Sequence, residues 1–180
     1  KVAETITTAA AGGKGTPASA IKAILPVHMG GHPCDMGPLL RSAREHNIRL
    51  VEDAAHALPV QYGDSFLGCM GDAGVFSFYA TKTITTGEGG MVATADPEIA
   101  RRIGVMRLHG IDREVWKRYT DRNASWKYDV VAAGYKYNLP DMAAAIGRVQ
   151  LKRAYEFLKK RRRIAERYLH AWSDYDFLEL

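Results

Sequence analysis

Residues 76–90 read FSFYATKTITTGEGG. The aromatic and apolar residues at the start are typical of a buried strand, and they give way to threonines, a lone Lys82 and a glycine-rich turn. A lysine at such a junction is usually a solvated loop residue. The alternative is that Lys82 lies at the end of a strand and serves a ligand site. Other segments of the chain are needed to choose between these two interpretations.

The composition is that of an ordinary globular domain. The chain has 180 residues, of which 47% are hydrophobic and 25% charged, and this balance does not favour disorder. The net charge of +5 owes much to one run, KKRRR at residues 159–163, which is best interpreted as a solvated helix face. No RNA-binding signature or aromatic platform accompanies it, so the sequence does not favour a nucleic-acid partner.

The two cysteines indicate a reducing compartment. Cys34 and Cys69 cannot form a disulfide framework, and neither has partners at metal-ligand spacing, so we predict no metal site. The N-terminal residues lack an apolar signal core, and no apolar run reaches membrane-spanning length. We therefore expect a cytoplasmic protein that does not interact with a membrane.

Strand-like and helix-like segments alternate along the chain, and this alternation predicts an α/β fold with a mainly parallel sheet flanked by helices. Residues 1–20 are poorly specified, and residues 111–137 form a polar loop. Asp35 is a plausible N-cap for the first helix, and Gly110 ends the second. The expected strands are 21–28, 48–55, 73–79 and 89–95, and the expected helices are 35–47, 96–109 and a single long helix from about 140 past 168.

Ligands bind beyond the carboxyl ends of the strands in such sheets. Asp53 lies at one predicted strand end and Lys82 follows another. Asp53 could simply cap the next turn, with His56 a structural histidine; alternatively, Asp53 pairs with a cationic ring nitrogen while the His56 imidazole covers a flat ligand. Ser77 could bond its neighbours or bind a phosphate. The glycines that follow Lys82 are turn formers rather than a phosphate-binding fingerprint: Gly87, Gly89 and Gly90.

The combination of these residues is more specific than any one of them. A strand-end carboxylate, an aromatic ring three residues later, and then a serine and a lysine after the next strand together describe a pyridoxal phosphate site. The chemistry of that cofactor requires a primary amine for a Schiff base, a carboxylate that keeps the pyridine nitrogen protonated, and donors for the phosphate.

Several longer motifs carry a resemblance to a known family: VEDAAHALP, GDAGVFSFYATKTITTGEGGMV, RLHG and GYKYNLPDMAAAIGRVQLKR. The chain resembles the DegT/StrS-type nucleotide-sugar aminotransferases, and especially the branch that makes 4-amino sugars, such as UDP-4-amino-4-deoxyarabinose, for cell-surface polysaccharides. The resemblance runs from about residue 24 to 168 and implies the type I fold of pyridoxal-phosphate-dependent transferases, like aspartate aminotransferase. Residues 21–139 would be part of the cofactor-binding large domain, and residues 140–180 a long helix leading toward a small domain.

The resemblance implies a role for each site residue. Lys82 would form the Schiff base with the cofactor and then move a proton between the cofactor and the sugar. Asp53 would hold the pyridinium nitrogen, His56 would stack on the ring, and Ser77 would bond the phosphate. Asn138 would reach the phosphate of a neighbouring subunit's cofactor, which implies a homodimer with shared active sites.

The implied reaction moves an amino group from glutamate to a 4-keto nucleotide sugar. A non-catalytic relative of the same fold and an aminotransferase acting on a 3-keto sugar are the alternatives. The retained Lys82 argues against the deoxygenating branch of the family, where a histidine stands at this position, and Pro140 replaces an arginine found in other members. The polar loop could hold the sugar nucleotide by stacking and phosphate contacts around Trp116, Arg118, Arg122 and Trp126. The alternative is that this loop is a surface lid or a dimer contact.

Overall fold

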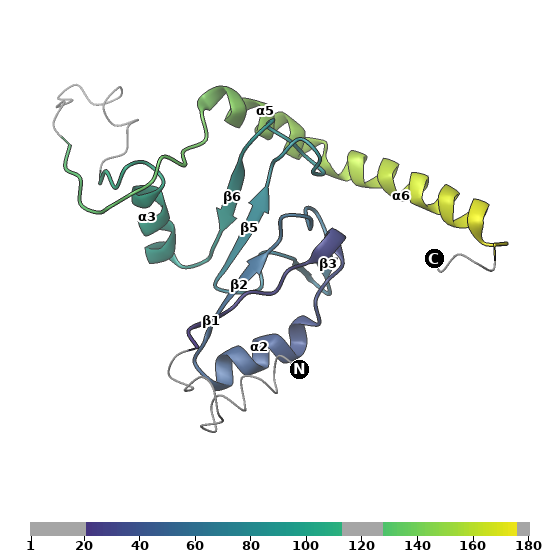
Figure 1. The fold of residues 1–180 in the computed structure, drawn as a ribbon, viewed down its shortest axis with the longest axis horizontal. Helices are drawn as coiled ribbons and strands as arrows, with labels where there is room; N and C mark the ends of the chain where they lie inside the picture. Colours follow the sequence, from purple (N-terminus) through teal and green to yellow (C-terminus); the bar gives the residue numbers. More distant parts are fainter. Residues whose placement is uncertain (1–20, 113–127, 176–180) are drawn as a thin grey trace.

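A four-stranded sheet lies at the centre of the computed structural model, which describes residues 21–112 and 128–175 (Figure 1). The first three strands in the spatial order β1-β2-β5-β6 are parallel, and β6 runs antiparallel to β5. The predicted α/β fold with a mainly parallel sheet is therefore confirmed. The strands are β1 (Ala23–Ile24), β2 (Arg49–Asp53), β5 (Ala73–Ser77) and β6 (Gly90–Ala93).

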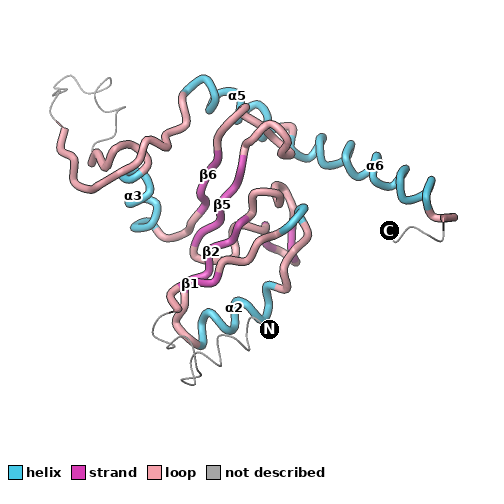
Figure 2. The backbone as a smooth tube through the Cα atoms, viewed as in Figure 1, coloured by secondary structure: helices cyan, strands magenta, loops and turns pink. Residues whose placement is uncertain are grey.

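The helices are distributed around this sheet and beyond it (Figure 2). Helix α2 (Met36–Glu45) packs against β1 and β2. Helix α3 (Pro97–Met106) follows β6, and its N-cap Asp96 accepts hydrogen bonds from the backbone N–H groups of Glu98 and Ile99. Helices α5 (Asp141–Lys152) and α6 (Ala154–Trp172) come last, and α6 extends away from the sheet (Figure 1). Between β2 and β5 lies a small hairpin of β3 (Gln61–Tyr62) and β4 (Ser65–Phe66), and a 3-10 turn, η2 (Met29–Gly31), precedes α2.

The alternation of side chains along β2 and β5 separates a packed face of the sheet from an open one. Leu50, Glu52 and Phe76 are buried on one face. Asp53 and Val75 are aligned in register on the opposite face and stay partly or fully exposed, because successive strand residues point to opposite sides. The open face therefore carries the polar end of β2.

Four features differ from the sequence-based expectations. The helix expected over 96–109, with Gly110 as its end, stops at Met106. The strand expected over 21–28 has only two residues plus an isolated bridge at Val27, because Pro26 has no N–H for the sheet ladder. Asp35 occupies the N-cap position of α2 but makes no cap hydrogen bond, since its carboxylate accepts from the Tyr62 hydroxyl instead. The single helix expected from about 140 is two helices, broken at Arg153, whose φ of −101° and ψ of 1° are not helical.

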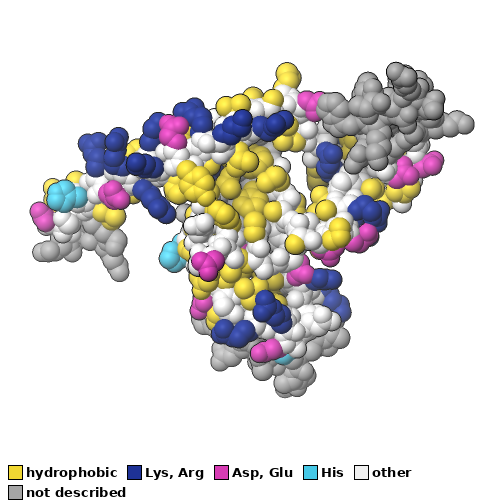
Figure 3. All heavy atoms as spheres, turned by 180° about the vertical axis from the view of Figure 1, so that it is seen from behind, with side chains coloured by type: hydrophobic (Ala, Val, Ile, Leu, Met, Phe, Trp, Pro, Cys, Tyr) yellow, Lys and Arg dark blue, Asp and Glu magenta, His cyan; other side chains and the backbone are white. Residues whose placement is uncertain are grey.

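Much of the apolar surface is not covered within the described residues. Figure 3 shows hydrophobic side chains gathered on one face of the molecule, beside the lysines and arginines that line α6. Met142, Ile146 and Val149 of α5 are all more than half exposed. Residues 159–163 are exposed as well, which confirms the interpretation of the KKRRR run as a solvated helix face.

Candidate functional site

Asp53 is held at the carboxyl end of β2 by its backbone and its side chain. Its N–H donates to the Pro26 carbonyl over 2.9 Å, and its carbonyl accepts from the His28 N–H over 3.1 Å. The Oδ1 atom accepts from the Ala55 N–H over 3.1 Å, which fixes the orientation of the carboxylate. Within the described residues Oδ2 has no hydrogen-bond partner. The side chain caps a turn, as one interpretation expected, and still presents one oxygen to a ligand.

His56 lies three residues beyond Asp53 with an exposed side chain. Its Nδ1 atom accepts the Gly30 N–H over 3.0 Å, so in the neutral ring the proton is on Nε2. Gly30 donates this bond from a left-handed conformation with φ of 62°, which glycine adopts without strain. The η2 turn therefore fixes the edge of the imidazole.

Ser77 is the last residue of β5, the strand that runs parallel to β2. Because Asp53 is in register with Val75, Ser77 lies on the same face of the sheet, two residues farther toward the same end. The Ser77 Oγ atom accepts from the Tyr79 N–H over 3.3 Å. A hydroxyl that accepts one bond retains its own proton to donate elsewhere.

Lys82 lies in the loop that joins β5 to β6. The loop is fastened to Phe78, whose carbonyl accepts from the Thr86 N–H and the Thr85 hydroxyl, each over 3.0 Å. The Lys82 N–H donates to the Tyr79 carbonyl over 3.0 Å. In residues 21–112 and 128–175 the Lys82 Nζ atom forms no hydrogen bond or ion pair, although the side chain is half-buried. The backbone is thus ordered while the amine has no partner in this part of the protein.

The glycines after Lys82 act as turn residues, as the sequence predicts. Gly87 and Gly89 have φ angles of 81° and 146°, which residues with a Cβ atom rarely adopt. Gly90 pairs with Ser77 at the start of β6. The turn therefore returns the chain directly to the strand that ends in Ser77.

The structure brings four of the five predicted site residues to one end of two neighbouring strands. Asp53 ends β2 and His56 follows it, while Ser77 ends β5 and Lys82 follows it. Asn138 is separate: its Oδ1 atom accepts from the Lys136 ammonium group, and no contact joins it to these four within the described residues. The loop residues Trp116, Arg118, Arg122 and Trp126 lie outside the described residues.

Comparison with known proteins adds independent evidence to this geometry. The sequence pattern of the DegT/DnrJ/EryC1/StrS aminotransferase family matches residues 1–179. The chain belongs to this family. The spore coat polysaccharide biosynthesis protein SpsC of Bacillus subtilis is 48% identical over 152 residues, which are 84% of this chain and 39% of SpsC. The chain thus spans about two fifths of the length of this relative.

Solved structures of similar proteins share the fold. The PLP-form of the putative sugar aminotransferase Spr1654 from Streptococcus pneumoniae superimposes with a TM-score of 0.73 at 31% identity, covering 85% of this chain and 42% of that one. The GDP-4-keto-6-deoxymannose-3-dehydratase ColD, solved with bound GDP-perosamine, gives a TM-score of 0.77 at 30% identity, covering 88% and 43%. The sheet described above is accordingly part of a pyridoxal-phosphate-dependent transferase fold.

The residues at the strand ends fit the cofactor of this aminotransferase family. Asp53 has an oriented carboxylate with an unused oxygen for a ring N–H, and Ser77 retains a hydroxyl proton for a phosphate oxygen. The Lys82 amine has no competing partner within the described residues. These three features meet the donor and acceptor pattern that pyridoxal phosphate requires.

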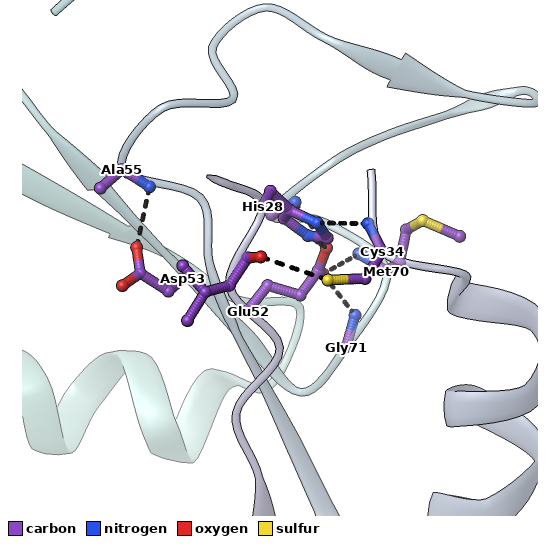
Figure 4. Close-up of polar contacts among 9 residues, drawn as sticks. His28, Cys34, Glu52, Asp53, Ala55, Met70 and Gly71 are labelled. Carbon is purple, nitrogen blue, oxygen red and sulfur yellow. Dashed lines mark hydrogen bonds and ion pairs between the residues drawn. The ribbon is translucent and has the colours of Figure 1, made fainter. Parts of the chain in front are cut away.

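Sequence reasoning missed a buried polar cluster directly behind Asp53. Figure 4 shows Glu52 pointing away from Asp53 and toward His28. The Glu52 carboxylate accepts the His28 Nε2–H over 3.0 Å and three backbone N–H groups, at 2.7 Å from Gly68, 2.7 Å from Met70 and 2.8 Å from Gly71. His28 Nδ1 accepts the Cys34 N–H over 3.2 Å, which assigns the proton to Nε2. Glu52 and Asp53 are consecutive strand residues, so their side chains point to opposite faces of the sheet. This alternation was the signal in the sequence that one of the two acids is buried.

Two further observations concern other kinds of site. Within the described residues, no three His, Cys, Asp or Glu side chains are grouped so that they could hold a metal ion. Helices in the same ranges include none long and apolar enough to cross a membrane.

Proposed function

We propose that the protein containing this chain is a pyridoxal-phosphate-dependent aminotransferase that moves an amino group from glutamate to a 4-keto nucleotide sugar. The observation that carries the proposal is the position of Lys82 in the loop directly after β5, with Ser77 and Asp53 on one face of two adjacent parallel strands. Its relatives support the substrate class: one is named for polysaccharide biosynthesis, and another was solved with a nucleotide sugar bound.

The cofactor, when bound, supplies an aldehyde and a ring that withdraws electrons. In this proposal Lys82 Nζ would condense with that aldehyde, with the aldehyde oxygen leaving as water, and once displaced by an amino substrate it would carry a proton between the cofactor and the substrate carbon. Asp53 accepts a hydrogen bond from the ring N–H through Oδ2. This negative charge favours the protonated ring, because a nearby opposite charge stabilises a cation.

His56 and Ser77 position the cofactor in the same proposal. The His56 ring, fixed at Nδ1 by Gly30, covers one face of the cofactor ring. The Ser77 hydroxyl, oriented by the Tyr79 N–H, donates to the phosphate. Asn138 would act across a homodimer interface on the neighbouring subunit's phosphate. A cytoplasmic location belongs to the same proposal, since glutamate and nucleotide sugars are cytoplasmic metabolites.

The test is amino transfer by the intact protein, supplied with pyridoxal phosphate, glutamate and 4-keto sugars linked to UDP, GDP or TDP. We expect a 4-amino sugar and 2-oxoglutarate in equal amounts, and no product from the Lys82→Ala variant. Lys159→Ala, which changes an exposed lysine of α6, should match the unaltered protein. Amination at C3 would replace the 4-keto assignment, and undiminished turnover by Lys82→Ala would overturn the proposal.

A further inference from the structure

Two polar contacts join the Lys82 loop to the α5 and α6 helices. The Thr85 N–H donates to the Gln150 Oε1 atom over 3.4 Å. The Arg161 Nη2 atom donates to the carbonyl oxygen of Lys82 itself over 3.4 Å. Gln150 lies in the last turn of α5 and Arg161 in the third turn of α6. Both contacts therefore fall within residues 82–85, the segment of the loop that begins with Lys82.

Buried apolar side chains lie both in the Lys82 loop and at the start of α6. Ile84 and Ala154 are each only 2% exposed and belong to the same buried cluster, with Phe157 packed against it. Helix α5 also approaches closely at Gly147, where an added Cβ atom would lie 3.0 Å from the Thr86 Cγ2 atom. Residues 82–86 are therefore supported by both helices.

The break at Arg153 gives this support its geometry. Arg153 leaves the helical conformation, binds Glu156 through its Nε atom over 3.1 Å, and places its guanidinium group 4.7 Å from the centre of the Phe157 ring. Ala154, the first residue of α6, is buried at this corner. The bend thus allows Gln150 and Arg161 to reach the same loop from two different helices.

Resting on the function proposed above, we propose that Gln150 and Arg161 are positioning residues that hold the Lys82 loop for its reaction with the cofactor. A reacting amine has to be held within a narrow geometry, and small displacements of its backbone slow the reaction. Arg161 acts on the Lys82 peptide directly, and Gln150 acts on Thr85 at the opposite side of Ile84. The contacts therefore control the rate at which Lys82 reacts rather than the affinity for the amino substrate.

The test compares Gln150→Leu and Arg161→Leu with a matched control, Arg162→Leu, in the intact protein. Arg162 is exposed next to Arg161. It lines a hollow along α6 to which the Lys82 loop contributes no residue. Each positioning variant should lower kcat, and the rate at which added pyridoxal phosphate bonds to Lys82, by about three- to tenfold, as expected for the loss of one hydrogen bond. KM for the amino donor should stay at the value of the control.

Conservative variants separate positioning from a general loss of packing. Gln150→Glu keeps an oxygen acceptor and Arg161→Lys keeps a cationic donor, so both should recover most of the lost rate. The two leucine substitutions combined should be less harmful than the product of their separate effects, because both contacts act on one loop.

Hydrogen exchange provides a readout that does not depend on the cofactor. The Thr85 amide should exchange about three- to tenfold faster in Gln150→Leu than in the Arg162→Leu control. Equal exchange and equal bonding rates in all variants would overturn the inference. If the unaltered protein fails to bond pyridoxal phosphate, the proposed function is wrong, whereas normal bonding with unaffected variants disproves only the positioning role.

Discussion

His28 Nε2 donates to Glu52 Oε2 over 3.0 Å, and both side chains are fully buried. Glu52 immediately precedes Asp53 and binds three backbone N–H groups of the loop between β4 and β5. Glu52, the neighbour of the proposed cofactor ligand Asp53, therefore anchors the loop that leads into β5. This cluster joins the two strands whose ends carry the candidate site.

Replacing Glu52 should destabilise the fold more than its small change in shape suggests. Glu52→Gln substitutes an NH2 group for one of two oxygens that together face four donors, which leaves buried donors unpaired. We expect a loss of about 3 kcal/mol in the free energy of unfolding, measured by chemical denaturation. Glu98→Gln, which alters an exposed ion pair with Arg101, should change it by about 0.5 kcal/mol or less. Equal effects would contradict the anchoring role.

Gly74 and Gly104 should respond in opposite ways to an added methyl group. A Cβ atom at Gly74 would lie 2.0 Å from the Gly68 carbonyl oxygen, whereas one at Gly104 meets nothing within 4 Å. Gly74→Ala should therefore cost about 3 kcal/mol, because strand backbone must move. Gly104→Ala, in α3, should add about 0.5 to 1 kcal/mol through its helix propensity. Thermal unfolding of both variants distinguishes close packing from a general intolerance of substitution.

Asp72 should contribute to the acid sensitivity of the protein. Partial burial would raise the pKa of Asp72, but its bonds to the Leu50 N–H and to Arg49 outweigh this effect and lower the pKa of the carboxyl group. A lowered pKa adds stability that is complete above the ordinary aspartate pKa of about 4 and is lost as the pH falls through the folded value. Asp72→Asn should therefore be less stable at neutral pH and lose less stability on acidification. Parallel pH profiles for variant and unaltered protein would contradict this assignment.

Asp53→Asn tests the charge at the end of β2. Asparagine keeps an oxygen for the Ala55 N–H but removes the negative charge, so the dissociation constant for pyridoxal phosphate should rise about ten- to a hundredfold. Asp64→Asn, in the exposed β3–β4 turn, is the control and should bind normally. Cofactor titration followed by absorbance measures both. Unchanged affinity in Asp53→Asn would remove Asp53 from the cofactor site.

The strand ends and their polar residues could be predicted from local sequence patterns. Asp53, Ser77 and Lys82 each follow a run of apolar residues, and parallel strands place such ends together. The Gly87 and Gly89 turn could also be predicted, since it depends on local backbone preferences.

Features that depend on distant residues could not be predicted in the same way. Glu52 is buried because donors from four other residues meet it. Gln150 reaches Thr85 across 65 positions of the chain, and Arg161 reaches Lys82 across 79. The break at Arg153 has no proline or glycine to mark it, and the burial of Ala154 and Ile84 in one hydrophobic cluster becomes evident only in three dimensions.

Borohydride reduction of the intact protein in the presence of pyridoxal phosphate tests the central claim most directly. Reduction makes the bond between a lysine amine and the cofactor permanent, and peptide mapping by mass spectrometry then identifies the lysine. We predict a single cofactor-labelled peptide, modified at Lys82, and no labelled peptide from Lys82→Ala. Labelling of a different lysine, or full labelling of the Lys82→Ala protein, would contradict the account.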